Sequence, residues 1–129
     1  MGLEDAWGGN DAVEVSLSNP ALGPKAPIMV LRGFACGAFN SSEEAGAPPE
    51  VARKAGENVQ YAAKIVSPAR WTAEMRIPFA SLAIDPDVDL RSPLNLAVRK
   101  QGDEPWVMWR GTGGCTWLVP EAGRVRFVR

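Results

Sequence analysis

The feature that most constrains this chain is an alternation of apolar and polar residues with a period of two, in short runs that end at Gly, Pro, Asn or Asp. Successive side chains of a strand point to opposite faces of a sheet, so each run predicts a half-buried strand. The predicted strands cover residues 13–17, 28–31, 59–66, 71–77, 94–98, 106–109, 116–119 and 124–127. About eight short strands with turns between them predict an all-β fold, an antiparallel β-sandwich.

Two segments interrupt the pattern. Pro78 has no N–H to donate and ends its strand, and residues 79–84 then predict one short helical turn. Residues 40–58 are polar, rich in Gly, Pro and Ala, and longer than a hairpin loop, so we expect a surface excursion. Within it, Pro49 suits the first turn of a short helix and Gly56 suits the position after its end.

Length and charge bound the domain count and the classes of partner. A chain of 129 residues predicts one domain, residues 1–129. Its 14 Lys and Arg residues nearly balance 15 Asp and Glu, which argues against electrostatic capture of nucleic acid. No stretch approaches the roughly 20 apolar residues of a membrane span, and the N-terminus has neither the basic nor the apolar segment of an export signal. We therefore expect no nucleic acid partner, no membrane span and no signal peptide in this chain.

The chain has five tryptophans and no histidine. Without imidazole, a Ser-His-Asp or Cys-His nucleophile, a His general base and a His-ligated zinc site are excluded. We therefore expect no catalytic residues and no enzyme. The two cysteines, Cys36 and Cys115, leave open one disulfide or two small buried thiols.

Several carboxylates and glycines imitate functional motifs. Asp85, Asp87 and Asp89 alternate as in a calcium loop, but Leu90 and Leu96 stand where an EF-hand needs Gly and Glu. A polar turn is the simpler interpretation. Residues 111–114 are Gly-Thr-Gly-Gly, yet they lead to no helix with a Lys, so they predict a turn and not a phosphate cradle. Four carboxylates are candidates for the acid pair of a glycoside hydrolase: Glu14, Glu74, Asp103 and Glu104. Solvated strand faces are the simpler interpretation of all four.

The tryptophans differ in their setting. Trp71 lies on the apolar side of an alternating strand, so we expect it in the core, and Trp106 and Trp109 fall on opposite faces, so at least one should be buried. Trp7 and Trp117 lie beside glycines, outside any strong alternation. Indoles on loops at the rim of a sandwich suit stacking on the C–H face of a sugar ring, while ordinary packing at the rim is the alternative.

Four segments, in this order, resemble the carbohydrate-binding module family 9-like (DOMON-like) sugar-binding domains. They are NDAVEV, WTAEMRIPFASL, LNLAVR and AGRV, at residues 10–15, 71–82, 94–99 and 122–125. The family shows D-x-V-E-V, W-x-x-E-x-x-I-P-F-x-x-L, an N-x-x-x-R strand and a terminal strand that begins with Gly. The second segment is the most specific, because a strand that ends in Ile-Pro with an immediate short turn is a distinctive junction.

The resemblance implies a jelly-roll β-sandwich that binds glycan chain ends between two tryptophans. By position, Trp7 and Trp117 are that pair, and Glu14, Arg32 and Arg99 are the polar partners of the sugar hydroxyls, although surface charge is the alternative for these three. It further implies an accessory module of a secreted bacterial protein, extracellular or periplasmic, that degrades or senses polysaccharide. The family's structural calcium stays open but cannot be assigned to residues here, so we name no metal ligands and expect no other cofactor.

The chain departs from the family at its N-terminus. Family members carry more strands before the D-x-V-E-V segment, whereas about ten residues precede it here. We therefore expect the first strands to be missing, which exposes a sheet edge and apolar surface and favours self-association. Two alternatives stay open. One is a structural or interaction sandwich of a multidomain surface protein, and the other is a haem carrier, which would need one of four methionines as axial ligand.

Overall fold

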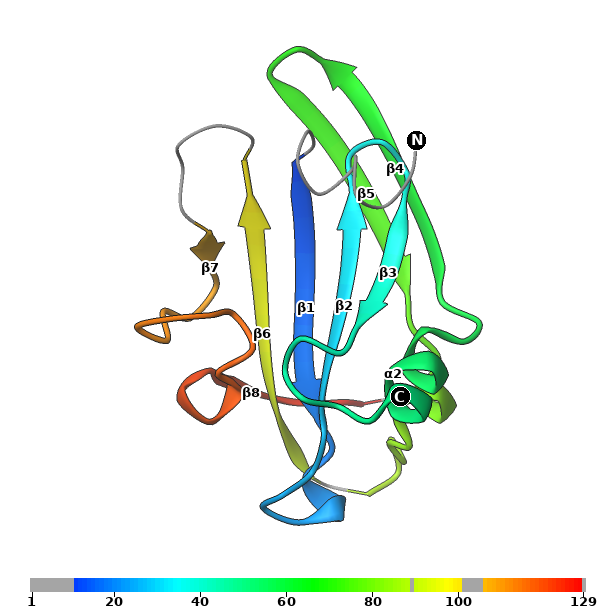
Figure 1. Ribbon diagram of the computed structural model, residues 1–129, viewed down its shortest axis with the longest axis vertical. Helices are drawn as coiled ribbons and strands as arrows, with labels where there is room; N and C mark the ends of the chain where they lie inside the picture. The colour runs from blue at the N-terminus through cyan, green and yellow to red at the C-terminus, as the bar shows by residue number, and fades with distance from the viewer. Residues whose placement is uncertain (1–10, 89, 101–105, 129) are drawn as a thin grey trace.

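The computed structural model describes residues 11–88, 90–100 and 106–128. The described chain forms two antiparallel sheets (Figure 1). Its strands are β1 (Ala12–Ser18), β2 (Ile28–Phe34), β3 (Phe39–Ser42), β4 (Gln60–Ser67), β5 (Arg70–Arg76), β6 (Arg91–Arg99), β7 (Val107–Met108) and β8 (Gly123–Arg126). The larger sheet has the order β3-β2-β1-β6-β7 with β8 also paired to β6, and β4 and β5 form the smaller one. The prediction of an all-β, antiparallel, sandwich-like fold is confirmed.

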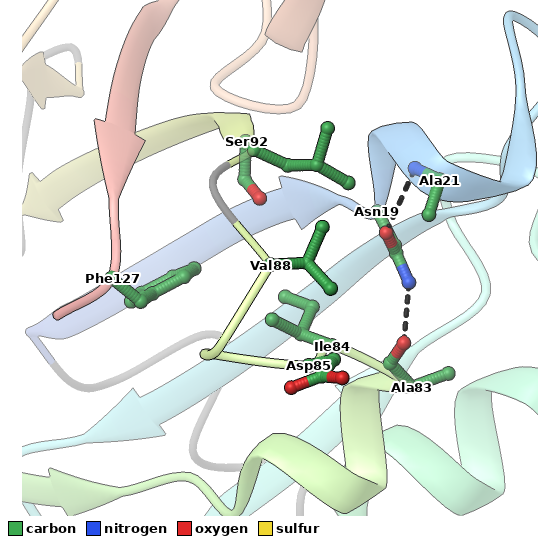
Figure 2. A pocket seen from close by; sticks show the side chains of 9 residues that line it. Asn19, Ala21, Ala83, Ile84, Asp85, Val88, Ser92 and Phe127 are labelled. Atoms are coloured by element: carbon green, nitrogen blue, oxygen red, sulfur yellow. Dashed lines mark hydrogen bonds between the residues drawn. The ribbon is translucent and has the colours of Figure 1, made fainter. Parts of the chain in front are cut away.

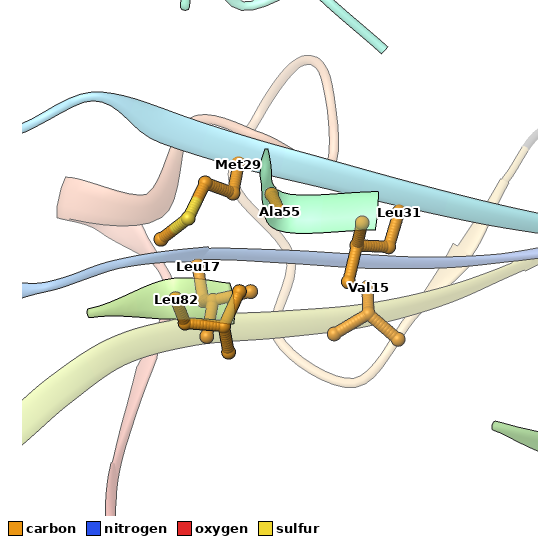
Figure 3. Close-up of a cluster of buried hydrophobic side chains, with 6 residues drawn as sticks. All are labelled: Val15, Leu17, Met29, Leu31, Ala55 and Leu82. Atoms are coloured by element: carbon orange, nitrogen blue, oxygen red, sulfur yellow. The ribbon is translucent and has the colours of Figure 1, made fainter. Parts of the chain in front are cut away.

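One face of the larger sheet, which we call the core face, carries the main hydrophobic core. Antiparallel register places Val15 of β1 opposite Leu31 of β2 and Leu96 of β6. Helix α2 (Pro49–Gly56) and the 3-10 turn η2 (Phe79–Leu82) pack onto this face. The buried cluster consists of Val15, Leu17, Met29, Leu31, Ala55 and Leu82 (Figure 3). The alternation in β1 thus places its valines and Leu17 on one side, as the pattern predicts.

The opposite face of the same sheet, which we call the polar face, is also buried. Glu14 and Ser16 of β1 and Asn95 of β6 have exposed fractions of 2%, 0% and 0%. Residues 109–122, which we call the covering segment, fold back over this face and include the 3-10 turn η3 (Val119–Glu121). The prediction of a solvated strand face for Glu14 is therefore wrong, because a distant part of the chain excludes water from it.

The polar excursion of residues 40–58 is only partly what the sequence predicts. The helix forms as predicted, and it begins at Pro49 but includes Gly56. Its Ala52 and Ala55 are buried against the core face, and Ser41 Oγ donates a hydrogen bond to the Ala52 carbonyl at 2.6 Å. Residues 40–42 belong to β3, which the sequence did not predict. The segment is therefore a strand and a packed helix and not a free surface loop.

The β4–β5 hairpin projects beyond the larger sheet (Figure 1). Tyr61 anchors its base, because the phenol donates a hydrogen bond to the Phe34 carbonyl at 2.8 Å. The ring lies so close to Gly33 that a Cβ at this position would collide with it. Burial of the ring, with Cys36 nearby, raises the pKa of Tyr61 to about 12. The hairpin therefore meets the sheet where β2 lacks a side chain.

Beyond that base, apolar surface is exposed between the hairpin and β6. Ile65 of β4 and Leu96, Val98 and Val107 of the larger sheet have exposed fractions of 64%, 43%, 39% and 66%. Val98 and Val107 are cross-strand neighbours, and Ile65 and Val98 line one cavity together with Trp71. We call these four residues the open apolar face. Trp71, predicted as core, is only partly buried at its margin.

Three further predictions about turns and side chains can be compared with the structure. Residues 116–119 do not form the predicted strand, because they have no pairing strand and pass through a turn into η3. Trp106 packs against the buried Ala12 and Phe34. Trp106 is only partly buried there, and Trp109 is 56% exposed, so neither of the two tryptophans is fully buried as predicted. The two cysteines are exposed free thiols, so neither the disulfide nor the pair of buried thiols is found.

Candidate functional site

A buried ion pair lies at the centre of the polar face. The register of β1 and β2 places Glu14 directly opposite Arg32. Arg32 Nε donates a hydrogen bond to Glu14 Oε2 at 2.8 Å, and Nη2 donates to the same oxygen. The two side chains are 7% and 3% exposed for Arg32 and Glu14. Ser16 Oγ and the Thr116 side chain also hydrogen-bond to Glu14, so the buried carboxyl group has several partners.

A second carboxylate extends this pair to the surface. Arg32 Nη2 also donates to Glu44 Oε2 at 2.7 Å. The other oxygen of Glu44 accepts a hydrogen bond from Trp117 Nε1 at 3.3 Å. Glu44 follows β3, and its backbone N–H donates to Ser42 Oγ at 3.1 Å. We call Glu14, Arg32, Glu44 and Trp117 the carboxylate–indole network, which runs from the buried sheet to a partly exposed tryptophan.

The two carboxyl groups of the network have opposite pKa shifts. Burial raises the pKa of Glu14 above its ordinary value, although the Arg32 guanidinium opposes this by its charge and hydrogen bonds. Burial of Glu44 acts in the same upward direction, but the hydrogen bonds and charge of Arg32, with the bond from Trp117, outweigh it and lower the pKa of Glu44. The outer carboxylate is therefore ionised at neutral pH and can accept further hydrogen bonds from a ligand.

The raised pKa of Glu14 predicts a pH dependence of stability. A carboxyl group with a higher pKa in the folded chain binds its proton more tightly when folded, so stability falls as pH rises from the ordinary value of 4.5 through the raised value. We expect the free energy of unfolding to fall in this window, and the Glu14→Gln variant, which cannot titrate, to lack that fall.

Urea unfolding of both proteins at several pH values between about 4 and 8 tests this prediction. Glu44 has the opposite sign, because a lowered pKa costs stability as pH falls below 4.5. Both proteins retain Glu44, whose contribution to stability changes mainly below pH 4.5, outside the window in which Glu14 acts. Parallel curves across the whole range would contradict a raised pKa for Glu14.

Three of the five predicted site residues come together in the network. Glu14, Arg32 and Trp117 belong to β1, β2 and the covering segment, and Glu44 joins them. Arg99 lies on the same face of the sheet, opposite Ala12, with its guanidinium carbon 5.9 Å from the centre of the Trp106 ring. Trp7 lies outside the described residues.

Glu44 is the site residue that sequence reasoning missed. It belongs to the polar excursion, where an acidic residue among small and polar neighbours indicates solvated surface. The signal that could have revealed it is β3, because a strand paired with β2 brings the residues after Ser42 near Arg32. That strand, Phe-Asn-Ser-Ser, has no apolar alternation from which to recognise it.

Two polar side chains that line a small pocket at the far end of the sheet, Asn19 and Asp85, are already engaged in hydrogen bonds (Figure 2). Asn19 donates its amide to the Ala83 carbonyl and accepts from the Ala21 N–H. Asp85 Oδ1 accepts from the Asp87 N–H at 2.9 Å, which agrees with a polar turn, while Asp89 lies outside the described residues. Within the described ranges, no three Asp, Glu or Cys side chains gather as a metal site, and no helix is long and apolar enough to cross a membrane.

Comparison with known proteins gives no match for this chain. No protein-family model matches it. Neither a curated protein nor a solved structure is similar enough to be reported as a relative. The resemblance to carbohydrate-binding module family 9-like domains therefore stays a prediction from the sequence motifs.

Proposed function

We propose that this chain is a non-catalytic carbohydrate-binding domain whose ligand stacks on Trp117 and bonds to Glu44. The observation that carries the proposal is the convergence of Trp117 with Arg32 and Glu14 through Glu44. These residues come from four separate parts of the chain. The motif resemblance by itself predicts Glu14, Arg32 and Trp117 as sugar contacts.

The chemistry of the network suits a sugar ring. The indole of Trp117 offers an apolar face for ring C–H groups, and the ionised Glu44 accepts hydrogen bonds from hydroxyls beside that face. Arg32, on the buried side of Glu44, donates a charge-assisted hydrogen bond to it, so the Glu44 carboxylate is preorganised as an acceptor. A single stacked ring with a few hydrogen bonds implies weak affinity, on the order of micromolar to millimolar.

The wider setting follows from the motif resemblance. By that resemblance Trp7 supplies the second indole, Arg99 a further donor to hydroxyls, and the domain serves as an accessory module of an exported polysaccharide-degrading or polysaccharide-sensing protein. Arg99 is positioned for a more local role as well, since its guanidinium lies near the ring of Trp106. The proposal for the ligand therefore rests mainly on Trp117 and Glu44.

Replacing Trp117 by Ala will abolish sugar binding without unfolding the domain. The side chain is partly exposed and makes one weak hydrogen bond, so its loss removes the stacking surface at little cost in stability. Retention on polysaccharide affinity gels and tryptophan fluorescence titrated with mono- and oligosaccharides measure the loss. We expect a loss of affinity of at least about tenfold.

The matched control is Trp109→Ala, which removes an equally large indole that is 56% exposed and lies against Gly123. We expect this variant to bind as the unaltered protein does. Retention of the Trp117→Ala variant at the level of the control would remove Trp117 from the site. Loss of binding in both variants would show that binding depends on the intact covering segment and not on stacking by Trp117.

The open apolar face favours a second candidate, an interaction domain that does not bind sugar. Isolated apolar residues are common on protein surfaces, but adjacent exposed ones mark contact sites. Val98 and Val107 are neighbours across two strands, and Leu96 shares their face. A folded protein that ignores a broad sugar panel and dimerises with rising concentration in sedimentation would favour this candidate.

A further inference from the structure

We infer that Asn95 is the positioning residue of the proposed sugar site, because it holds the covering segment that places Trp117 beside Glu44. This inference rests on the proposed function. Asn95 does not itself belong to the carboxylate–indole network, and the motif resemblance assigned it no role in binding. Its hydrogen bonds to the covering segment identify Asn95 as a positioning residue.

Asn95 lies on the polar face of β6, opposite Ser16 of β1, and its side chain is completely buried. Its amide nitrogen donates hydrogen bonds to the Arg110 carbonyl at 3.0 Å and the Thr116 carbonyl at 3.3 Å. Its oxygen accepts from the Arg110 N–H at 3.1 Å. One side chain therefore ties both ends of the turn 110–116 to the sheet.

An amide is the side chain that this position requires. Residues 110–116 contain three glycines and form no helix or strand, so their backbone groups lack regular hydrogen-bond partners there. The amide of Asn95 supplies two donors and an acceptor that also receives the Leu96 N–H at 3.0 Å. A buried backbone group without a partner costs about 1–3 kcal/mol, so loss of this amide favours release of the segment.

Release of the segment would act directly on the network. Thr116, whose carbonyl Asn95 binds, also hydrogen-bonds through its side chain to Glu14. The next residue, Trp117, reaches Glu44 at 3.3 Å. The bond from Asn95 to Thr116 is thus one residue away from the stacking indole, and it sets where that indole lies relative to the outer carboxylate.

The Asn95→Asp variant tests this role. It has the same shape, but an ionised carboxylate cannot donate to the two carbonyls, so we expect sugar affinity at about pH 7.5 to fall at least tenfold. Near pH 4.5 the new carboxyl group is protonated because it is buried, and its O–H restores one donor. We expect the affinity, expressed relative to the unaltered protein at the same pH, to recover at least in part.

The rate of trypsin cleavage after Arg110 is a second readout, and it needs no sugar. The N–H and the carbonyl of Arg110 both hydrogen-bond to Asn95. The peptide bond between Arg110 and Gly111 should therefore be protected in the unaltered protein and be cleaved at least about tenfold faster in Asn95→Asp at pH 7.5. Mass spectrometry identifies the cut. If the unaltered protein binds no sugar while cleavage still accelerates, the proposed function fails and the anchoring role of Asn95 stands.

Two more variants complete the test. Ser92→Ala removes a polar side chain that is 2% exposed on the same strand, and we expect it to change neither affinity nor cleavage. Asn95→Ser retains one donor and serves if the aspartate variant does not fold, with a smaller effect in the same direction. Unchanged affinity and unchanged cleavage in a folded Asn95 variant, or a loss of affinity that low pH does not relieve in Asn95→Asp, would overturn the inference.

Discussion

Substitution of Arg32 by Ala will lower the free energy of unfolding by about 3–5 kcal/mol. Arg32 and Glu14 are each less than one-tenth exposed, and Arg32 donates to two carboxylates. Without the guanidinium, Glu14 must either stay ionised in a water-poor site or take up a proton, and each choice costs stability. Urea unfolding at neutral pH, followed by far-UV circular dichroism, measures the loss.

Two variants show whether this loss comes from the buried charge. A double variant, Glu14→Leu with Arg32→Met, removes both charges while it keeps apolar volume, and such replacements are often neutral or stabilising. Glu44→Gln alters the outer carboxylate, which is 43% exposed, and should cost no more than about 1 kcal/mol. A loss below about 1 kcal/mol for Arg32→Ala would contradict a dry, paired site.

Substitution of Leu31 by Ala will lower the free energy of unfolding by about 2–5 kcal/mol. Leu31 is completely buried in the cluster between the core face, α2 and η2, so its removal leaves a cavity that the surrounding sheet cannot fill. The same urea unfolding experiment measures the effect.

Leu96 provides the matched control for this variant. It lies on the same face of the same sheet, one strand beyond Val15, but it is 43% exposed. We expect Leu96→Ala to cost less than about 1 kcal/mol at low protein concentration. Equal losses for Leu31→Ala and Leu96→Ala would mean that the open apolar face is covered in solution, as a second copy of the chain would cover it.

The strands that the sequence predicts well are those with strong alternation. In β1 and β6 one set of side chains is apolar and the other is polar or small, and this pattern reflects the pleat of a single strand. β3 was missed because Phe39 is its only apolar residue and pairing with β2 holds it in place. Residues 116–119 were predicted as a strand because they are apolar, yet apolar composition without a pairing partner makes no strand.

The candidate site could be predicted only in part. The motif resemblance predicts Glu14, Arg32 and Trp117 as site residues, and the structure links all three through the ion pairs and the hydrogen bond of the carboxylate–indole network. The resemblance does not include Glu44, and it includes Asn95 in its N-x-x-x-R strand without assigning it a role. Their roles depend on partners 12 residues away for Glu44 with Arg32, and 15 and 21 residues away for Asn95 with Arg110 and Thr116.

The sequence by itself determined the all-β class, the faces of most strands and the side of β1 on which Glu14 lies. These properties follow from local rules, because alternation, proline and glycine act on neighbouring residues. Only the tertiary structure decided that Glu14 is buried, that Glu44 joins Arg32 to Trp117 and that Leu96 stays exposed. Burial and pairing depend on which distant segment covers a face, and no local pattern in this chain records that the covering segment returns over the polar face.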